Sequence, residues 1–599
     1  MDNCLIRARL KALRESMAEE SIDYYLIPTA DFHNSEYVND YFKVREYFSA
    51  FTGSNGTLLV WQEGAGLWTD ERYFLQAEKE LEGTGITLFK MDMEGVPTIR
   101  EFLQEYMRMN QTLGFDGRVV SALGGIGYEK ALAFKQIRFR YDMDLAEGIW
   151  EGRPPFPAEP VYVLEESVAG ESYVSKRQKL IDAMEEQGAE AILLTKLDDI
   201  MWLFNLRGND VECNPVAMSY AYITASKSVL FLMPDALSKD VSKYLSNLGV
   251  EVEDYDKVVF FLKQACCGQN IQVDLRNINY STYRVLTDGS RMIDAKNPTE
   301  DWKAIKNPVE LAHMDAVFLK DSVAVTKFIY WLKTNVGKEQ LSEISASDYL
   351  ERLRRQIPEF IDLSFPTIAG YGANGAIIHY EATEESNALL KPEGFLLVDS
   401  GGQYMGGTTD VTRTISLGPL TDEMKKHYTL VAAGMLQLMN ATWKYGCTGR
   451  NLDICAREPL WSHGLDYNHG TGHGIGYILN VHEGPQNIRW KYAEGAKEAV
   501  LEAGMVVSDE PGVYIAGSHG VRIENCLVVE NTLKNEYGQF MRFKNLTWVP
   551  LDRDALDVRY LTENQKELVD MYQKKVDQLL APYLTEEEAQ WLHRETSKI

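Results

Sequence analysis

The sequence predicts an α/β protein made of two related α/β domains followed by a larger third domain. Its 599 residues exceed what one hydrophobic core usually serves, so two to four domains are expected. The segment from Gly152 to Pro160 contains four prolines in nine residues, which excludes a regular helix or a central strand. We interpret this segment as a linker. A repeated pattern on either side of it indicates that the two flanking domains are related.

The repeat is a charged amphipathic helix followed by a short apolar run. Leu13 precedes the run 24–27, and Leu180 precedes the run 191–194, with the same offset of 167 residues in each case. A short, continuously apolar run is typical of a buried strand. Any helix–strand unit gives such a pattern, but the constant offset favours a duplicated domain.

A second domain boundary is expected near Asn297-Pro298. Together with the linker, this boundary divides the chain into residues 1–156, 157–300 and 301–599.

Several helices are expected in the third domain. Asn307-Pro308 opens a long one, because proline at an early helical position lacks only an N–H that would be unpaired there. Another is expected from about residue 423 to 443. After Val549 the chain reads as a helical extension, with capping boxes at Thr562-x-x-Gln565 and Thr585-x-x-Glu588. This extension could pack within the chain or contribute to a dimer.

The composition is that of an ordinary soluble globular protein, with 45% hydrophobic and 25% charged residues. The formal net charge of −27 argues against nucleic acid and anionic membrane surfaces as partners. The start has no apolar signal-like segment, and no run of 18 apolar residues occurs, so we expect neither secretion nor a membrane span. Seven scattered cysteines without a Cys-x-x-Cys motif fit reduced thiols in the cytoplasm.

Two pairs of acidic residues lie at informative intervals in the last third of the chain. Asp399 ends an apolar run, and Asp410 lies eleven residues on, past four glycines. If the flanks form a symmetric hairpin, its tip falls at Tyr404-Met405 and the two aspartates face each other. Their Cβ atoms would then be roughly 4.5–5.5 Å apart.

Glu510 and Glu524 repeat this arrangement around a midpoint at Gly517, again within apolar runs. Taken singly, an aspartate after glycines is usually a turn residue, and a glutamate in a hairpin is usually solvated. As a set, carboxylates placed in apolar runs are costly to bury without a charge partner. Four carboxylates with the imidazole of His473 favour a site for divalent cations, and bridging carboxylates make a two-metal hydrolase plausible.

The glycines around His473 argue against two other sites. His469 and His473 have the spacing of two ligands on one helical face, but Gly470 and Gly472 between them argue against a helix. The glycine alternation also lacks the G-x-G-x-x-G register of a dinucleotide-binding loop. We expect these glycines to let the backbone approach metal and substrate closely.

The motifs as a set resemble the metallopeptidases of the pita-bread fold. Within that group, the chain resembles the long, three-domain cytosolic form of aminopeptidase P (Xaa-Pro aminopeptidase) over essentially its whole length. The segments that carry the resemblance are Asp399 to Asp410, His469-Gly-Thr-Gly-His473-Gly-Ile-Gly, Glu510-Pro-Gly, Arg522-Ile-Glu524-Asn, Asp31 to Val38, Trp68-Thr-Asp-Glu-Arg-Tyr-Phe74, Ile305-Lys-Asn-Pro-Val-Glu-Leu311, Ile378-His-Tyr380 and Val481-His-Glu-Gly-Pro485.

This resemblance implies two creatinase-like N-terminal α/β domains and a pita-bread catalytic domain. It also implies two divalent metal ions per chain, with manganese favoured and zinc or cobalt as alternatives. The implied ligands are Asp399, Asp410, His473, Glu510 and Glu524, of which Asp410 and Glu524 would bridge the ions.

Further roles follow from the same resemblance. His379 would stabilise the oxyanion, His469 and His482 would hold the substrate around its proline, and Tyr514 would line the proline pocket. Arg522 would orient a metal ligand. Without the resemblance, a lone histidine is more often a core residue, and Arg522 would be a surface charge of little energetic worth.

The implied reaction is hydrolysis of an X-Pro bond by a hydroxide bridging two ions, with Glu510 as the proton acceptor, and the implied assembly is a homodimer. A prolidase shares the five ligands but accepts only dipeptides and is usually shorter. A methionine aminopeptidase is mostly the catalytic domain alone. Creatinase and some histone-chaperone domains keep the fold without the ligands, which leaves metal-free catalysis or a non-catalytic peptide-binding module. The three-domain length and five intact ligand positions favour aminopeptidase P.

Overall fold

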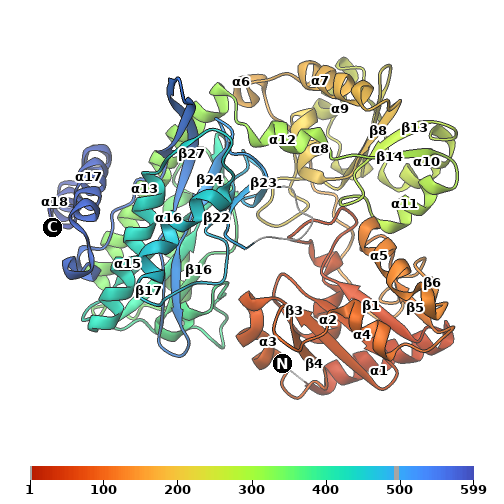
Figure 1. Cartoon of the computed structure of the whole chain (residues 1–599), viewed down its shortest axis with the longest axis horizontal. Coiled ribbons are helices and arrows are strands. Elements are labelled where there is room, and N and C mark those ends of the chain that lie inside the picture. The colour runs from red at the N-terminus through yellow and green to blue at the C-terminus, as the bar shows by residue number, and fades with distance from the viewer. Residues whose placement is uncertain (1–2, 492–497) are drawn as a thin grey trace. The chain divides into compact units, whose positions relative to one another are not determined.

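The computed structural model describes residues 3–491 and 498–599 of the chain (Figure 1). Its contacts divide the chain into two compact units. One consists of Met1–Leu164 with Glu171–Thr299, and the other of Glu165–Gly170 with Glu300–Ile599. All the candidate site residues lie in the second unit.

The first unit contains two six-stranded mixed sheets of the same topology. The strand order is β4-β3-β2-β1-β5-β6 in one sheet and β12-β11-β10-β8-β13-β14 in the other. In both sheets the successive pairings are parallel, antiparallel, antiparallel, parallel and parallel. The expected pair of related α/β domains is therefore confirmed. The strands are β1 (Tyr24–Pro28), β2 (Thr57–Trp61), β3 (Gly64–Thr69), β4 (Thr87–Lys90), β5 (Thr112–Phe115), β6 (Arg138–Arg140), β8 (Ala191–Leu194), β10 (Ser219–Thr224), β11 (Ser228–Leu232), β12 (Glu251–Asp254), β13 (Asn270–Val273) and β14 (Arg291–Asp294).

The repeated helix–strand unit takes the same place in each of these domains. Helix α1 (Asn3–Glu19) leads into β1 and buries Leu13, and α7 (Tyr173–Glu186) leads into β8 and buries Leu180. Each leucine lies on the apolar stripe with which its helix covers the sheet. The offset seen in the sequence thus reflects equivalent positions in two copies of one topology.

The second unit combines antiparallel sheets with long helices (Figure 1). Its largest sheet has the order β21-β28-β27-β24-β22-β23, two smaller ones have the orders β16-β17-β20 and β15-β18-β19, and β25 pairs with β26 alone. The strands are β15 (Phe360–Leu363), β16 (Ile368–Tyr371), β17 (Phe395–Ser400), β18 (Gly402–Tyr404), β19 (Gly407–Thr408), β20 (Val411–Ser416), β21 (Thr442–Lys444), β22 (Gly472–Gly474), β23 (Glu483–Ile488), β24 (Val506–Asp509), β25 (Gly512–Ile515), β26 (His519–Arg522), β27 (Asn525–Asn535) and β28 (Gly538–Asn545). The main helices are α13 (Pro308–Asn335), α14 (Glu343–Arg354), α15 (Asp422–Met439), α16 (Gly449–Trp461), α17 (Glu563–Leu580) and α18 (Glu586–Glu595).

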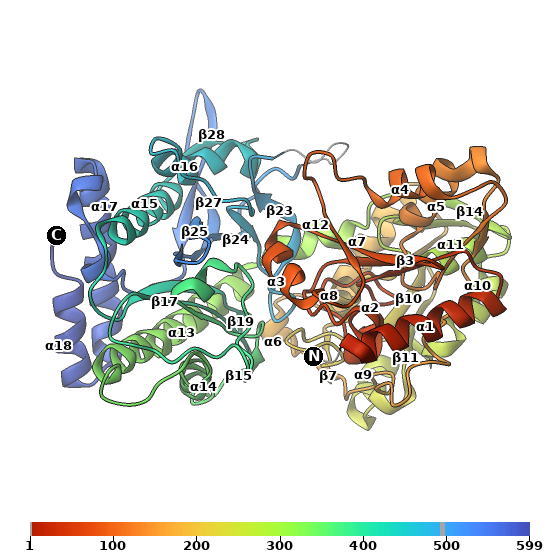
Figure 2. The same ribbon diagram turned by 90° about the horizontal axis from the view of Figure 1, so that it is seen from below.

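The C-terminal helices belong to the core of this unit. Figure 2 shows α17 and α18 beside α15 and α13. Leu396 of β17, Val431 of α15, Val569 of α17 and Leu592 of α18 all lie in one buried apolar cluster. Burying such a side chain is worth about 1.5–3 kcal/mol. The extension after Val549 therefore packs within the chain, which is one of the two roles that the sequence left open.

Helix starts were predicted better than helix ends. Asn307 caps α13 with proline at its first position, and both predicted C-terminal capping boxes are present. The helix expected to reach residue 443 ends at Met439 instead. Trp443 lies on β21, where it is buried against Phe543 of β28 with ring centroids 4.5 Å apart. Packing in the sheet overrides the helical pattern of the sequence here.

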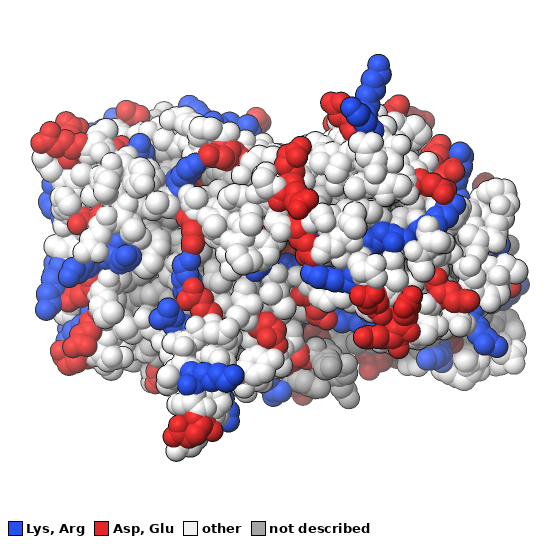
Figure 3. All heavy atoms as spheres, turned by 90° about the horizontal axis from the view of Figure 1, so that it is seen from above, with Lys and Arg blue, Asp and Glu red and all other residues white. Residues whose placement is uncertain are grey.

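On the face drawn in Figure 3, basic side chains are interspersed with acidic ones. Among the residues that the structure describes, no helix combines the length and the apolar character needed to cross a bilayer.

A buried histidine pair joins α15 to β26. His427 Nδ1 lies 3.0 Å from His519 Nε2, and Ser518 Oγ lies 2.8 Å from His519 Nδ1. Burial lowers the pKa of His427, and burial together with His427 lowers the pKa of His519 to about 4. Glu423 opposes both shifts. Both rings are therefore neutral at pH 7.

This pair predicts a loss of stability in acid. The unfolded chain binds protons at these histidines near pH 6.5, whereas the folded chain resists protonation until about pH 4 at His519. The unfolded state therefore takes up more protons, and on the order of 2–3 kcal/mol present above pH 6.5 is lost as the pH falls towards 4. Urea unfolding between pH 7 and 4.5 measures this. The variant H427N/H519N should show a shallower pH dependence, and an unchanged slope would contradict the assignment.

Candidate metal centre

The first acidic pair lies on a hairpin whose register differs from the expected one. Asp399 of β17 lies opposite Thr412 of β20, and the ladder from β18 to β19 ends in a turn at Met405-Gly406. The expected tip at Tyr404-Met405 and the direct pairing of Asp399 with Asp410 are therefore wrong. Asp410 is displaced by two residues from the position across from Asp399. Because side chains alternate with a period of two, this shift leaves both carboxylates on one face.

The reason for the shift lies in the turn and in Tyr404. A symmetric tip would put Tyr404 in the turn, but its ring is buried and its hydroxyl donates to Asp321 at 2.6 Å. Gly406 takes the turn position instead. A Cβ there would meet Val317 of α13 at 2.9 Å, so a larger residue would push the turn away from the helix.

The second acidic pair lies where one hairpin passes between two sheets. Strands β24 and β27 pair Asp509 with Asn525, and β25 and β26 continue the same register around Gly517. Gly517 has a φ of +72°, which glycine adopts without strain. Glu510 and Glu524 occupy the interruption between the two ladders, so the register places them across from each other as expected.

His473 reaches the same place from β22, between β23 and β24. A Cβ on Gly472 would lie 2.0 Å from the carbonyl oxygen of Ser508, and one on Gly474 would lie 2.1 Å from that of Glu483. No side chain fits at either glycine. The glycine alternation thus allows close approach of three strands, whereas the predicted approach of the backbone to metal and substrate stays a prediction.

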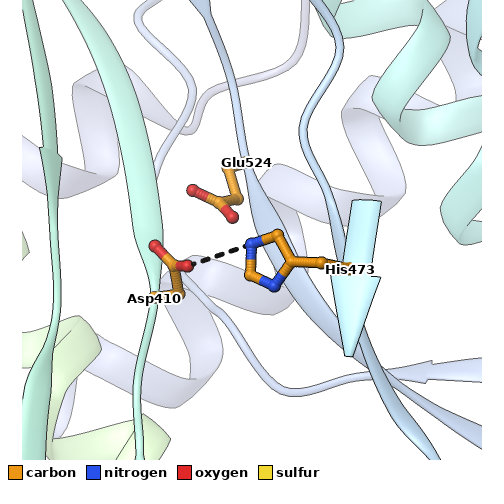
Figure 4. A group of neighbouring side chains, drawn as sticks. All are labelled: Asp410, His473 and Glu524. Atoms are coloured by element: carbon orange, nitrogen blue, oxygen red, sulfur yellow. Dashed lines mark ion pairs between the residues drawn. The ribbon is translucent and has the colours of Figure 1, made fainter. Parts of the chain in front are cut away.

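Asp410, His473 and Glu524 converge on one point (Figure 4). Ligand atoms of Asp410, His473 and Glu524 all lie within 4.8 Å of one another. His473 Nε2 is 3.6 Å from Asp410 Oδ2 and 3.4 Å from Glu510 Oε1. His473 Nδ1 lies 3.0 Å from the carbonyl oxygen of Gly474, which can only accept. In the neutral ring, Nδ1 therefore carries the hydrogen and Nε2 offers its lone pair to the centre.

The pKa shifts show that holding the ionised carboxylates together costs free energy. Burial, then Asp399 and Glu510, raises the pKa of Asp410 well above its usual range. Burial and Asp410 do the same for Glu524. Burial raises the pKa of Glu510 to about 7, although Arg522 opposes the shift. Like charges in a desolvated site disfavour one another's ionised forms.

A divalent cation fits this donor set. Three buried carboxylate oxygens, Asp399 Oδ1, Asp410 Oδ1 and Glu524 Oε1, have no hydrogen-bond partner among the described residues. A carboxylate oxygen only accepts, so each needs a proton donor or a cation. A site rich in carboxylate oxygen with one imidazole nitrogen suits hard or borderline divalent metals.

Arg522 holds one of the proposed ligands. Its Nε and Nη2 donate to Asp399 Oδ2 at 3.0 and 2.6 Å, and both side chains are nearly fully buried. The surface charge pair that was the alternative is thus excluded. Glu524, two residues on, is held instead by Thr412, whose hydroxyl donates to Oε2 at 2.8 Å.

Arg522 also starts a chain of contacts that leads away from the centre. Its Nη1 donates to the Tyr514 hydroxyl at 2.8 Å, and that hydroxyl lies 2.9 Å from His469 Nε2. His469 Nδ1 is 2.7 Å from the carbonyl oxygen of Gly470, so in the neutral ring Nε2 accepts from Tyr514. The predicted residues Tyr514 and His469 are therefore joined to the predicted ligand Asp399 through one guanidinium.

The other two histidines approach from separate segments. The His482 ring lies 4.3 Å from the His473 ring, centroid to centroid, with the planes at 76°. Glu483, the next residue, is buried between Lys303 and Lys306. His379 follows Ile378, whose carbonyl oxygen accepts from Arg522 Nη2 at 3.4 Å.

Sequence reasoning missed the polar residues that support the centre. Ser508 donates to Glu510 Oε1 at 3.1 Å, and Arg413 donates to the Glu524 carbonyl oxygen at 2.6 Å and to the Tyr572 hydroxyl at 2.8 Å. In the sequence, Arg413 is a single charged residue within a strand-like segment, and only the structure shows that this strand, β20, is fully buried. Hydroxyl groups such as that of Ser508 gave no signal, because serine is common in any strand or loop.

Four family models match the chain. A creatinase/prolidase N-terminal domain matches residues 9–138 and another matches 152–310. Metallopeptidase family M24 matches 312–531, and the C-terminal region of peptidase M24 matches 539–599. A probable Xaa-Pro aminopeptidase P of Fusarium vanettenii is 38% identical over 99% of both chains. The chain belongs to the aminopeptidase P branch of metallopeptidase family M24.

Solved structures agree with this membership. An X-prolyl aminopeptidase of Caenorhabditis elegans, described as a cytosolic enzyme with a di-nuclear active site, superposes with a TM-score of 0.94 at 30% identity over 100% of both chains. A Xaa-Pro dipeptidase of Bacillus anthracis superposes with a TM-score of 0.51 at 25% identity. It covers 64% of this chain and 99% of its own. The shorter relative thus lacks a counterpart for about a third of this chain.

The contact of Arg522 with Asp399 predicts that a change at position 522 weakens metal binding. Lysine at position 522 keeps the charge but cannot contact Asp399 and Tyr514 at once as the forked guanidinium does. The variant R522K should bind manganese about 10- to 100-fold more weakly than the wild type. Calorimetric titration of the chelated protein measures this. Y514F, which leaves the contact with Asp399 in place, is the matched control, and wild-type affinity in R522K would contradict this role of Arg522.

Proposed function

We propose that this chain is a metal-dependent aminopeptidase that releases the first residue from peptides with proline at the second position. The observation that carries the proposal is the convergence of Asp410, His473 and Glu524, with Glu510 beside His473. Three buried carboxylate oxygens there lack a hydrogen-bond partner among the described residues. The full-length likeness to relatives named Xaa-Pro aminopeptidase P supplies the substrate class. Peptides are thus the proposed partners.

Two divalent ions are proposed for the centre, with manganese preferred and zinc or cobalt as alternatives. Asp399, Asp410, His473, Glu510 and Glu524 would hold them, with Asp410 and Glu524 shared between the two. When bound, the ions supply Lewis acidity that activates water and polarises the scissile carbonyl group. The excess of oxygen over nitrogen donors supports manganese over zinc.

Glu510 is proposed to carry the proton. Ser508 holds its Oε1 at 3.1 Å, which orients the carboxyl group towards the centre. A carboxylate held beside the attacking water can accept its proton and later return it. Glu510 would take a proton from the attacking water and pass it to the nitrogen of the leaving proline.

The surrounding side chains are proposed to bind substrate. His379 would donate to the oxygen of the carbonyl group under attack, where negative charge develops. His469 and Tyr514, joined at 2.9 Å, and His482 would surround the proline ring. A proline amide has no N–H, so shape and apolar contact rather than a hydrogen bond would select it. Arg522, which contacts both Tyr514 and Asp399, would fix these side chains relative to the metal centre.

A prolidase is the second candidate, because the prolidase group shares the ligand set. The dipeptidase structure from Bacillus anthracis matches only 64% of this chain, whereas the aminopeptidase from Caenorhabditis elegans matches all of it. The additional N-terminal domain therefore favours an aminopeptidase over a dipeptidase. A non-catalytic peptide-binding module is disfavoured by the complete donor set.

Hydrolysis of Arg-Pro-Pro and of Ala-Pro tests the proposal. After chelation and return of manganese, we expect metal-dependent release of free arginine from the tripeptide, at a rate well above cleavage of Ala-Pro. Preference for the dipeptide would indicate a prolidase. Cleavage of neither peptide by fully metal-loaded protein would refute both enzymatic readings. The variant E510Q controls for contaminating peptidases.

Three further assignments are proposals of the same kind. The domain division remains 1–156, 157–300 and 301–599. We propose a cytoplasmic location, in line with the cytosolic relative and with seven free cysteines. We also propose a homodimer. Sedimentation velocity should then give about twice the chain mass of 68.0 kDa at micromolar concentration, and a monomer across the whole range would reject it.

A further inference from the structure

The segment that carries His379 is an irregular loop closed at its base by one buried carboxylate. The loop leaves β16 at Tyr371 and returns alongside the start of α14 at Ala388. Glu343, in the first turn of α14, is fully buried. Its backbone N–H donates to the Ala388 carbonyl oxygen at 3.1 Å, so the helix start and the returning chain are already in contact.

Both carboxylate oxygens of Glu343 accept from this loop. Oε1 accepts from the Tyr371 backbone N–H at 2.7 Å and from Asn374 Nδ2 at 2.9 Å. Oε2 accepts from the Ala388 backbone N–H at 2.8 Å and from the Tyr380 hydroxyl at 2.9 Å. One side chain thus joins the end of β16, the middle of the loop and the returning chain at Ala388.

The energetics make this contact a strong constraint. A buried carboxylate is tolerated only when its hydrogen-bonding capacity is filled, and bonds to a charged acceptor are stronger than neutral ones. The position in the first helical turn also favours negative charge. Burial raises the pKa of Tyr380 to about 12, so this phenol remains a donor at neutral pH.

His379 lies between two fixed neighbours. On one side, the Ile378 carbonyl oxygen accepts from Arg522, which also holds the proposed ligand Asp399. On the other side, the Tyr380 hydroxyl donates to Glu343. The backbone of His379 is therefore tied to the metal centre through Arg522 and to α14 through Glu343.

We propose that Glu343 is a positioning residue for His379, which fixes the loop so that the imidazole meets the carbonyl oxygen as negative charge develops on it. This rests on the proposed function of the centre. Glu343 itself touches neither substrate nor any of the five metal-binding side chains in the contacts described above. Its effect on catalysis should therefore pass entirely through the loop.

The variant E343Q keeps the size of the side chain but removes its charge and replaces one acceptor oxygen with an NH₂ donor. Each oxygen of Glu343 accepts one backbone N–H, so either orientation of a glutamine amide points an NH₂ group at a backbone donor. We expect kcat for Arg-Pro-Pro to fall by about 10- to 100-fold, as for a misplaced catalytic group, while KM and manganese content stay near wild type. An interaction made only in the transition state gives this pattern.

A double-mutant cycle with H379A gives the decisive readout. If Glu343 acts through His379, the variant E343Q/H379A should be no slower than H379A alone, within about twofold. If the kcat losses of the two single variants multiply in the double variant, the proposal is overturned. It is also overturned if the kcat loss in E343Q follows a loss of bound manganese. D552N is the matched control, because Asp552 is another buried carboxylate that accepts backbone N–H groups, from Ser416 and Asp554. It should change stability without changing kcat per metal-loaded chain.

Hydrogen–deuterium exchange tests the loop independently of activity. In E343Q, peptides spanning residues 371–388 should exchange faster, whereas D552N should leave them unchanged. Y380F, which removes one of the four contacts, serves if E343Q does not fold, and should give a smaller change in the same peptides. Unchanged exchange in both loop variants would overturn the positioning role. If wild-type protein cleaves no X-Pro peptide, the proposed function fails while the exchange result still decides whether Glu343 holds the loop.

Discussion

The mutual repulsion of buried carboxylates is the constraint on which the catalytic unit depends. Burial and neighbouring acids raise the pKa of Asp410, Glu510 and Glu524. Among the four acids, and within the described part of the chain, a guanidinium ion pairs directly with the Asp399 carboxylate alone. Such a cluster persists only because the surrounding fold is stable enough to hold it and because cations can bind between its oxygens. The repulsion between carboxylates that destabilises the metal-free protein is therefore also the source of its affinity for metal ions.

The fold meets this constraint by placing the acids where strands end or change sheets. Asp410 lies between two short ladders of one hairpin, and Glu510 and Glu524 lie between two ladders of another. The alternation of side chains along the strands puts the acids of each hairpin on one face, and Asp410 and Glu524 from the two hairpins meet at a common point. The glycines beside His473 remove the side chains that would keep β22 away from its neighbours. The centre thus arises from irregular positions in otherwise regular sheets.

Support for the centre comes from parts of the chain distant in sequence. Arg413 connects the Glu524 backbone to Tyr572 of the C-terminal helix α17, and Arg522 connects Asp399 to the loop that bears His379. Glu343 closes that loop from α14. Buried guanidinium and carboxylate groups with several partners are suited to this task, since each joins polar groups from two or three segments at once.

Sequence patterns alone predicted the duplicated α/β topology and the helix starts, and they singled out Asp410, His473 and Glu524, whose ligand atoms lie close together. Apolar periodicity, capping residues and motif spacing are local in the chain, so they can be read without the fold. They did not determine the register of the Asp399 hairpin, which depends on the burial of Tyr404, or the end of α15, which depends on the packing of Trp443. The contact of Arg522 with Asp399 and the closure of the His379 loop by Glu343 became visible only in the folded chain. These contacts join residues far apart in the sequence, and a single chain carries no local signal for such pairings.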